Sequence, residues 1–142
     1  MSLSTSRLRE LLHRPVPSGA VDLIPALVIA LAYVGVLSAS VDDLGYSRDE
    51  GFYFHAARIY EQWFELFWQD RAQALEQVDT YWRVNREHPA FIKSLFALSH
   101  LVGFEKLKLF AEEGTSYRFV GMLLSGLGVG LVYLWGARAQ GR

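Results

Sequence analysis

The sequence predicts an all-α integral membrane protein in which two transmembrane helices are joined by an extracytoplasmic loop with interfacial amphipathic helices. Three observations predict this class. Hydrophobic residues make up 51% of the 142 residues and aromatic residues 14%, with a mean hydropathy above zero. Two runs of about 19 residues carry no charge, and the first part of the segment between them has helical periodicity.

The composition also excludes several function classes. A net charge of -1 and the lack of any Lys or Arg run argue against nucleic acid as a partner. Without cysteine there is no disulfide, no thiolate metal site and no cysteine nucleophile. We expect no metal and no cofactor, because no compact His or carboxylate spacing is present and Asp42-Asp43 alone is a weak signal.

The first membrane helix is expected at residues 23–41, after a cytoplasmic N-terminal segment at 1–22. Pro25 would fall in its first turn, where the missing amide donor costs little. A cleaved signal peptide is the alternative, because arginines precede the run and Ser38-Ala39-Ser40 resembles a cleavage site. The length of the apolar run favours a retained anchor.

The second membrane helix is expected at residues 118–137, followed by a short cytoplasmic end at 138–142. Gly126 and Gly130 are four residues apart, a spacing that lets another helix approach closely. Further transmembrane helices, of the same or another chain, are therefore expected partners. Glycine is also simply common in membrane helices, and the spacing alone does not separate these interpretations.

The topology depends on residues 89–104, an apolar stretch that contains Lys93 and His100 and is short for a span. We expect it to be interfacial or re-entrant. Both termini then share one side, which their arginines place in the cytoplasm, so that the loop at 42–117 faces outward from an inner or plasma membrane.

Two further helices are expected in this loop, at about 49–69 and 70–84. In the first, a polar stripe lies opposite a broad aromatic face. The stripe consists of His55, Arg58, Glu61, Gln62, Glu65 and Gln69. The aromatic face is typical of a helix on a membrane surface, although packing against other protein helices would give the same pattern.

Asp49 and Glu50 open the first loop helix and have two interpretations. Ser47 and Glu50 have the Ser-x-x-Glu spacing of a capping box, and acidic residues suit a first helical turn. A carboxylate there could also take a proton from a hydroxyl at the membrane surface. The two roles can coexist, and Asp49 is the candidate catalytic base.

Arg86, His88 and Lys93 form a second candidate group. Each alone has an ordinary explanation, because a His before Pro often bonds nearby backbone and a Lys near a membrane often extends toward water. Together they could bind a phosphate or diphosphate at the bilayer surface through charge-assisted hydrogen bonds.

These features together resemble the start of the polyprenyl-phosphate-sugar-dependent glycosyltransferases of the GT-C fold, family 39, which includes protein O-mannosyltransferases and aminoarabinose transferases. An N-terminal span is followed by Asp49-Glu50, and then by a stretch similar to the family's Glu-His-Pro-Pro-Leu-Gly-Lys-like motif. That stretch is Glu87-His88-Pro89-Ala90-Phe91-Ile92-Lys93. Tyr117-Arg118-Phe119 then opens an apolar helix much like the family's next span.

The resemblance implies an enzyme that moves a sugar from a polyprenyl phosphate to a hydroxyl of a protein or lipid acceptor. Asp49 would be the base and Glu50 would shape the acceptor site, while His88 and Lys93 would lie near the carrier phosphate. Family members carry many more spans, so we expect this chain to be an N-terminal portion that is inactive alone. The alternative is a non-catalytic two-span protein that docks onto a larger membrane complex.

Overall fold

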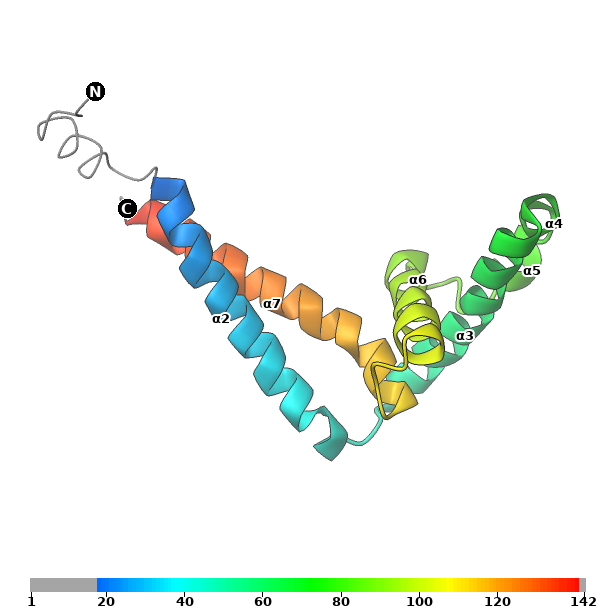
Figure 1. Cartoon of the computed structure of the whole chain (residues 1–142). Coiled ribbons are helices and arrows are strands. Elements are labelled where there is room, and N and C mark those ends of the chain that lie inside the picture. Colours follow the sequence, from blue (N-terminus) through cyan, green and yellow to red (C-terminus); the bar gives the residue numbers. More distant parts are fainter. Residues whose placement is uncertain (1–17, 141–142) are drawn as a thin grey trace, which may run out of the picture. The chain divides into compact units, whose positions relative to one another are not determined.

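A computed structural model describes residues 18–140 of the chain, and within them 83% of the residues are helical and none lies in a strand. The elements are α2 (Ser18–Ser40), the 3-10 turn η1 (Val41–Asp43), α3 (Arg48–Gln69), α4 (Arg71–Glu76), α5 (Val78–Trp82), α6 (Ala90–Ser99), the π-helix η2 (His100–Lys106) and α7 (Glu113–Ala139) (Figure 1). The chain divides into two compact units. The first unit comprises the described residues at 18–33 and 126–140, and the second is Val34–Ser125.

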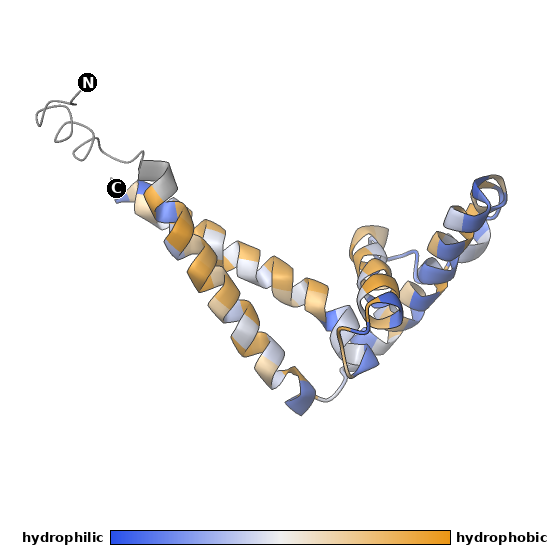
Figure 2. Cartoon of the chain, in the orientation of Figure 1, coloured by the Kyte–Doolittle hydropathy of each residue, from blue (hydrophilic) through white to orange (hydrophobic). Residues whose placement is uncertain are grey.

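Two helices in the described part of the chain are long and apolar enough to cross a membrane, in agreement with the predicted class. The candidate spans are Val21–Asp43 and Glu113–Ala139, and most of their residues are apolar (Figure 2). Each starts before the expected boundary, because the helical backbone extends past the uncharged run into polar residues. Of the terminal segments expected in the cytoplasm, residues 1–17 and 141–142 lie outside the described residues.

The predicted role of Pro25 as a helix start is wrong. The helix α2 already begins at Ser18, so Pro25 lies inside it. Its missing N–H leaves the carbonyl of Val21, four residues earlier, without the usual helical donor. Such a proline costs stability but is tolerated in membrane helices, where local adjustments satisfy the freed carbonyl.

In the first unit, small residues let α2 and α7 approach closely (Figure 1). Gly130 and Ala26 are buried, and a Cβ atom added to Gly130 would lie 3.3 Å from the Ala26 carbonyl oxygen and 3.4 Å from Ala30 Cβ. Gly126, one turn earlier, is buried too. A helix does approach Gly130, as its spacing predicted, and that helix is the chain's own α2.

The core of the second unit forms where α3 packs against α4, α5 and α6. The buried residues Ala57, Tyr60, Ala97 and Tyr117 make up its centre. Partly buried aromatic residues surround them, namely Phe54, Phe64, Trp82 and Phe96. Much of the aromatic face of α3 therefore packs against protein, which was the second interpretation of its pattern, while Phe52 and Trp68 remain more than half exposed.

The remaining loop helices differ in detail from the prediction. A break at Gln77 divides the expected helix at 70–84 into α4 and α5, and the Asp70 side chain caps α4 by accepting from Gln73 N over 3.0 Å. After Pro89, α6 continues directly into the π-helix η2.

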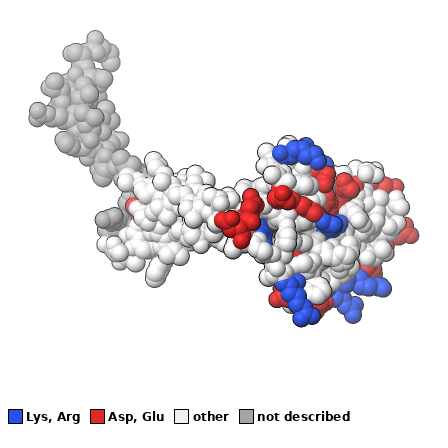
Figure 3. Space-filling model, turned by 90° about the horizontal axis from the view of Figure 1, so that it is seen from below, with Lys and Arg blue, Asp and Glu red and all other residues white. Residues whose placement is uncertain are grey.

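The charged side chains gather over the second unit, and the visible surface of the two long apolar helices is nearly uncharged (Figure 3).

Candidate functional site

Glu50 is held by two groups at the start of α3. Its backbone N–H donates to Ser47 Oγ over 3.3 Å, and the Ser47 N–H donates to Glu50 Oε2 over 2.9 Å, which confirms the predicted capping box. Arg118 of α7 donates from Nε to Oε1 and from Nη2 to Oε2, each over 2.8 Å. The hydrogen bond from Arg118 is the main reason why the pKa of Glu50 lies below its ordinary value. Glu50 is therefore an ionised positioning group.

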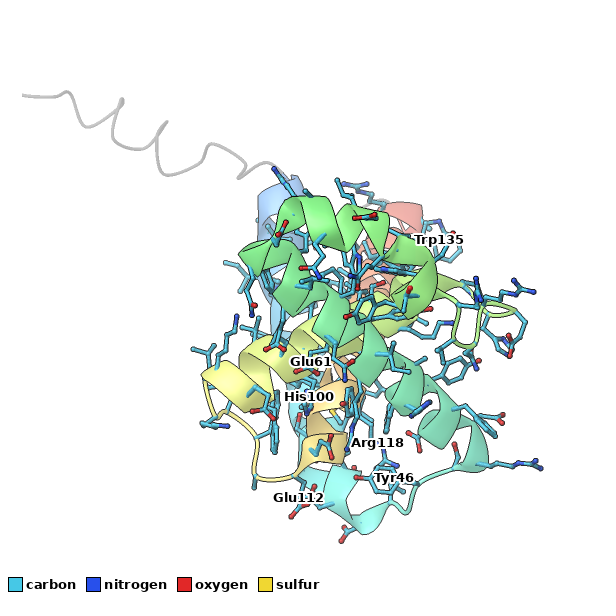
Figure 4. All side chains as sticks on the ribbon, turned by 90° about the vertical axis from the view of Figure 1, so that its right-hand side faces the viewer. Tyr46, Glu61, His100, Glu112, Arg118 and Trp135 are labelled. Atoms are coloured by element: carbon cyan, nitrogen blue, oxygen red, sulfur yellow. The ribbon has the colours of Figure 1, made fainter. Side chains whose placement is uncertain are left out.

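Arg118 also organises the chain between η1 and α3. Its Nη1 donates to the carbonyl oxygens of Val41 and Leu44 over 3.2 and 3.0 Å, and Nη2 donates to that of Gly45 over 2.8 Å. The guanidinium carbon lies 4.9 Å from the centroid of the Tyr46 ring (Figure 4). From the sequence, Arg118 was identified only within the Tyr117-Arg118-Phe119 stretch that opens the second apolar helix. An arginine directly before an apolar run often pairs with another charged group, but the sequence pattern does not identify which one.

Asp49 lies beside this network without joining it. Its carboxylate is exposed, and it makes no hydrogen bond or ion pair with any residue from 18 to 140. The capping box and Arg118 fix the first turn of α3, on which Asp49 stands. The structure thus separates the roles of the two acidic residues, because Glu50 anchors the helix and Asp49 faces solvent.

Lys93 differs from its two candidate partners because it is fully buried. Its ammonium donates to the carbonyl and side-chain oxygens of Asn85 and, over 3.0 Å, to the carbonyl oxygen of His88. Burial lowers the pKa of Lys93, and the nearby Glu87 partly opposes this shift. With three acceptors, the ammonium has no donor left for a phosphate. Lys93 therefore holds the Asn85–His88 turn in place.

Arg86 and His88 are exposed on this turn. The His88 ring contacts the ring of Tyr53, with centroids 5.5 Å apart. Tyr53 is one helical turn after Asp49 on α3, so the contact brings the turn to the same end of that helix. The structure thus brings His88 to the face of α3 that carries Asp49, and it places Lys93 beneath the turn.

A second polar cluster, which was not predicted from the sequence, lies between α3, η2 and α7. Glu61 Oε2 lies 2.6 Å from His100 Nδ1, and both residues are buried (Figure 4). The ring of His100 stacks on that of Tyr117, with centroids 4.6 Å apart. Glu113 forms an ion pair with Arg58 and lies 3.3 Å from His100 Nε2. The polar stripe on α3 was the signal for this cluster, but its partners come from distant parts of the sequence.

Burial raises the pKa of Glu61, and the neighbouring His100 acts in the opposite direction. Among residues 18–140, no three His, Cys, Asp or Glu side chains are placed to hold a metal ion. Two open hollows adjoin the Arg58–Glu113 pair. One, of about 440 Å³, includes Tyr46, Gly51 and His55, and the other, of about 370 Å³, includes Glu61 and His100.

The chain was compared with models of protein families, with curated proteins and with solved structures, and none of the three comparisons finds a match.

Proposed function

We propose that this chain is the N-terminal portion of a membrane glycosyltransferase of the GT-C, family 39-like type. It would transfer a sugar from a polyprenyl-phosphate carrier to a hydroxyl of a protein or lipid acceptor on the extracytoplasmic side. The exposed carboxylate of Asp49 is the observation that carries the proposal. It stands on a helix start that Glu50 and Arg118 fix, next to the beginning of an apolar helix long enough to cross a membrane.

In the proposed reaction, the Asp49 carboxylate accepts the proton of the acceptor hydroxyl. The hydroxyl oxygen forms a bond to the anomeric carbon of the sugar while the bond between that carbon and the phosphate oxygen breaks. Polyprenyl phosphate leaves with the electron pair, so that no covalent enzyme intermediate is needed. A base fixed at the helix start lowers the entropic cost of bringing the hydroxyl and the carboxylate together.

Arg86 and His88 are the proposed contacts to the carrier phosphate. Both are exposed, and the His88–Tyr53 contact keeps their turn at the Asp49 end of α3. Positive charge near the phosphate would stabilise the leaving group as it gains charge. Lys93, in this proposal, acts through the turn whose carbonyl oxygens it binds and does not contact the phosphate.

Further helices would have to complete the site. The hollows described above are open, whereas this chemistry requires a lipid groove and protection of the activated sugar from water. The proposal therefore includes additional transmembrane helices of the same or another chain. It also places both ends of the chain in the cytoplasm and the α3–α6 segment outside the inner or plasma membrane.

The test is sugar transfer in membranes that contain the protein as its gene encodes it. Membranes are supplied with a polyprenyl phosphate bearing a radiolabelled sugar, and label in protein and in lipid is counted separately. Transfer above that of membranes without the protein supports the proposal, and the labelled fraction identifies the acceptor class. Absence of transfer with every carrier-linked sugar tried, from membranes in which the protein is folded, would contradict it.

The second candidate function is docking onto a larger membrane complex without catalysis. The favouring observation is the exposed apolar surface of the two long helices, where Ile24 and Trp135 are 68% and 74% exposed. Because Gly130 already packs against α2, a partner would use another face of α7. Under this hypothesis Asp49→Asn would leave complex formation unchanged, and no sugar transfer would depend on Asp49.

A further inference from the structure

The connection between η2 and α7 exposes two large apolar side chains. Leu107 and Leu109 are 59% and 67% exposed, and the exposed lysines Lys106 and Lys108 alternate with them. We call residues 106–109 the leucine loop. Single exposed apolar residues are ordinary on a protein surface, whereas apolar residues grouped together mark contact surfaces. More than half of each leucine side chain faces away from the described part of the chain.

The leucine loop has a hydrogen-bonded conformation. The Leu107 N–H donates to the carbonyl oxygen of Val102 over 2.9 Å, and the Leu109 N–H donates to that of Gly103 over 2.8 Å. Lys108, between the two leucines, has a φ of 52°, in the left-handed region that favours glycine. A backbone in this region persists only where its surroundings fix it. The exposure of the two leucines is therefore built into the turn.

Phe110 places the loop beside the start of the apolar run of α7 (Figure 1). Its ring centroid lies 5.1 Å from that of Phe119. A Cβ atom added to Gly103 would lie 2.5 Å from the Phe110 ring, so the glycine makes room for this packing. Phe119 is the first residue of the uncharged run at 119–137, which is the part of α7 that fits a bilayer core. The neighbouring Leu109 therefore lies near the boundary of the span.

The side chains around the two leucines have the chemistry of a membrane surface. Lys106 Nζ lies 4.7 Å from the centroid of the Trp68 ring, and Trp68 is 58% exposed. Tryptophan is enriched at membrane–water interfaces, and a lysine stem can lie along apolar surface while its ammonium reaches water and phosphate. Lys108 Nζ lies 3.4 Å from Glu105 Oε2. This pairing offsets part of the positive charge, so the match is to a zwitterionic lipid surface.

We infer that the leucine loop inserts Leu107 and Leu109 into the phospholipid bilayer that holds α7. Moving the two side chains out of water is favourable, and the two lysines remain at the level of the lipid phosphates. This membrane contact comes from a loop and not from the aromatic face of α3, much of which packs against protein. The inference rests on α7 as a membrane span and does not depend on sugar transfer.

The test uses the absence of native cysteine, which allows a single nitroxide label on the full chain. The labelled Leu109→Cys protein is placed in phosphatidylcholine vesicles. Paramagnetic resonance then compares collisions of the label with oxygen, which dissolves in the bilayer, and with a water-soluble nickel chelate. A label at Leu75→Cys is the matched control, because Leu75 on α4 is 59% exposed, as Leu107 is. A label at Leu131→Cys, on the exposed surface of α7, is the bilayer reference.

We expect the labels at Leu109→Cys and Leu131→Cys to collide mainly with oxygen, and the label at Leu75→Cys to collide mainly with the nickel chelate. The Leu109 label should lie about 5 to 10 Å into the bilayer, as apolar side chains at an interface do. Leu107→Asp should move this label into water without changing the melting temperature, because Leu107 is exposed. Leu75→Asp should leave the label in place.

A preference for the nickel chelate at Leu109→Cys would overturn the inference. A label that neither reagent reaches would also overturn it, because protein would then cover the loop. The same holds for an equal oxygen preference at Leu75→Cys, or for no effect of Leu107→Asp. If the reference label at Leu131→Cys lay in water, α7 would not be a span and the inference would fail with it.

Discussion

Glu50 and Arg118 form an ion pair at the start of α3 that distinguishes Glu50 from the neighbouring Asp49. The two bonds between them, together with the capping box, occupy both oxygens of Glu50 and leave Asp49 as the free carboxylate of the pair. The capping box was predictable because it depends on residues three apart. Arg118 is 68 residues from Glu50, and no local pattern identifies a partner at that distance.

Arg118→Lys should destabilise the protein by about 2 to 4 kcal/mol. Lysine cannot reproduce the bidentate pair with Glu50, and loss of the guanidinium leaves the carbonyl oxygens that Arg118 binds without their donor. The measurement is thermal unfolding in detergent, followed by circular dichroism. Arg83→Lys is the control, since Arg83 is exposed. Equal melting temperatures for the two variants would contradict the anchoring role of Arg118.

The Glu50–Arg118 pair also predicts a pH dependence. The folded-state pKa of Glu50 lies below its ordinary value of 4.5, so its stabilising contribution is present above pH 4.5 and is lost as the pH falls below that value. The difference in melting temperature between wild type and Glu50→Gln should therefore shrink as the pH is lowered from 7 toward 3. A difference that stays constant over this range would argue against the ionised pair.

Lys93 and Arg86 lie close together, and the stability of variants can distinguish a structural role from a ligand-binding role for each. Lys93→Met should cost about 1 to 3 kcal/mol of unfolding free energy, because the oxygens of Asn85 and His88 lose their donor. Arg86→Met on the same turn should change stability by less than about 0.5 kcal/mol, as an exposed residue does. Chemical denaturation in detergent compares them. Similar losses, or none in either variant, would contradict the structural role of Lys93.

At the scale of elements, α2 and α7 were predictable because about 19 uncharged residues leave few alternatives to a membrane helix. Their early start was not predictable, since helix caps are weaker signals than hydropathy. The division of the expected helix at 70–84 likewise depends on tertiary contacts. Trp63 Nε1, for example, donates to the Ala74 carbonyl oxygen over 2.8 Å. The partners of the polar stripe on α3 could not be predicted, because they come from segments that are distant in the sequence.

Gly130→Leu should weaken the packing of α2 against α7 by about 1 to 3 kcal/mol, because the added side chain would meet Ala26 and Ala30. Gly128→Leu is a closely matched control on the same helix, because a Cβ atom at Gly128 meets nothing within 4 Å. Unfolding in micelles with increasing dodecyl sulfate measures the difference. Equal effects of the two substitutions would show that this helix contact adds no stability.

At the scale of the whole molecule, the structure supports the membrane class through its helical content and its two candidate spans. The Asp49-Glu50 pair and the stretch at 87–93, which resemble glycosyltransferase motifs, lie in one compact unit, and their residues have different environments there. Asp49, Arg86 and His88 are exposed, Glu50 is an anchor and Lys93 is buried. The exposure of these residues could not be predicted from the sequence, since it depends on the fold of the turn around Lys93.

The proposed topology is testable because the chain has no native cysteine. Gln140→Cys should be protected from a membrane-impermeant maleimide in intact cells, whereas Asp79→Cys, on exposed α5 surface, should be labelled. Both should react after the membrane is permeabilised. Labelling of Gln140→Cys in intact cells, or protection of Asp79→Cys, would reverse the assigned sides.

The proposed role of Asp49 as the base is tested most directly by the rate of sugar transfer by Asp49→Asn in membranes that contain the protein as its gene encodes it. We expect a loss of about a hundredfold or more, because a general base is removed, with unchanged abundance and melting temperature. Asp43→Asn, an exposed aspartate in η1, should keep the wild-type rate. Wild-type transfer by Asp49→Asn would contradict the role proposed for Asp49 as the base.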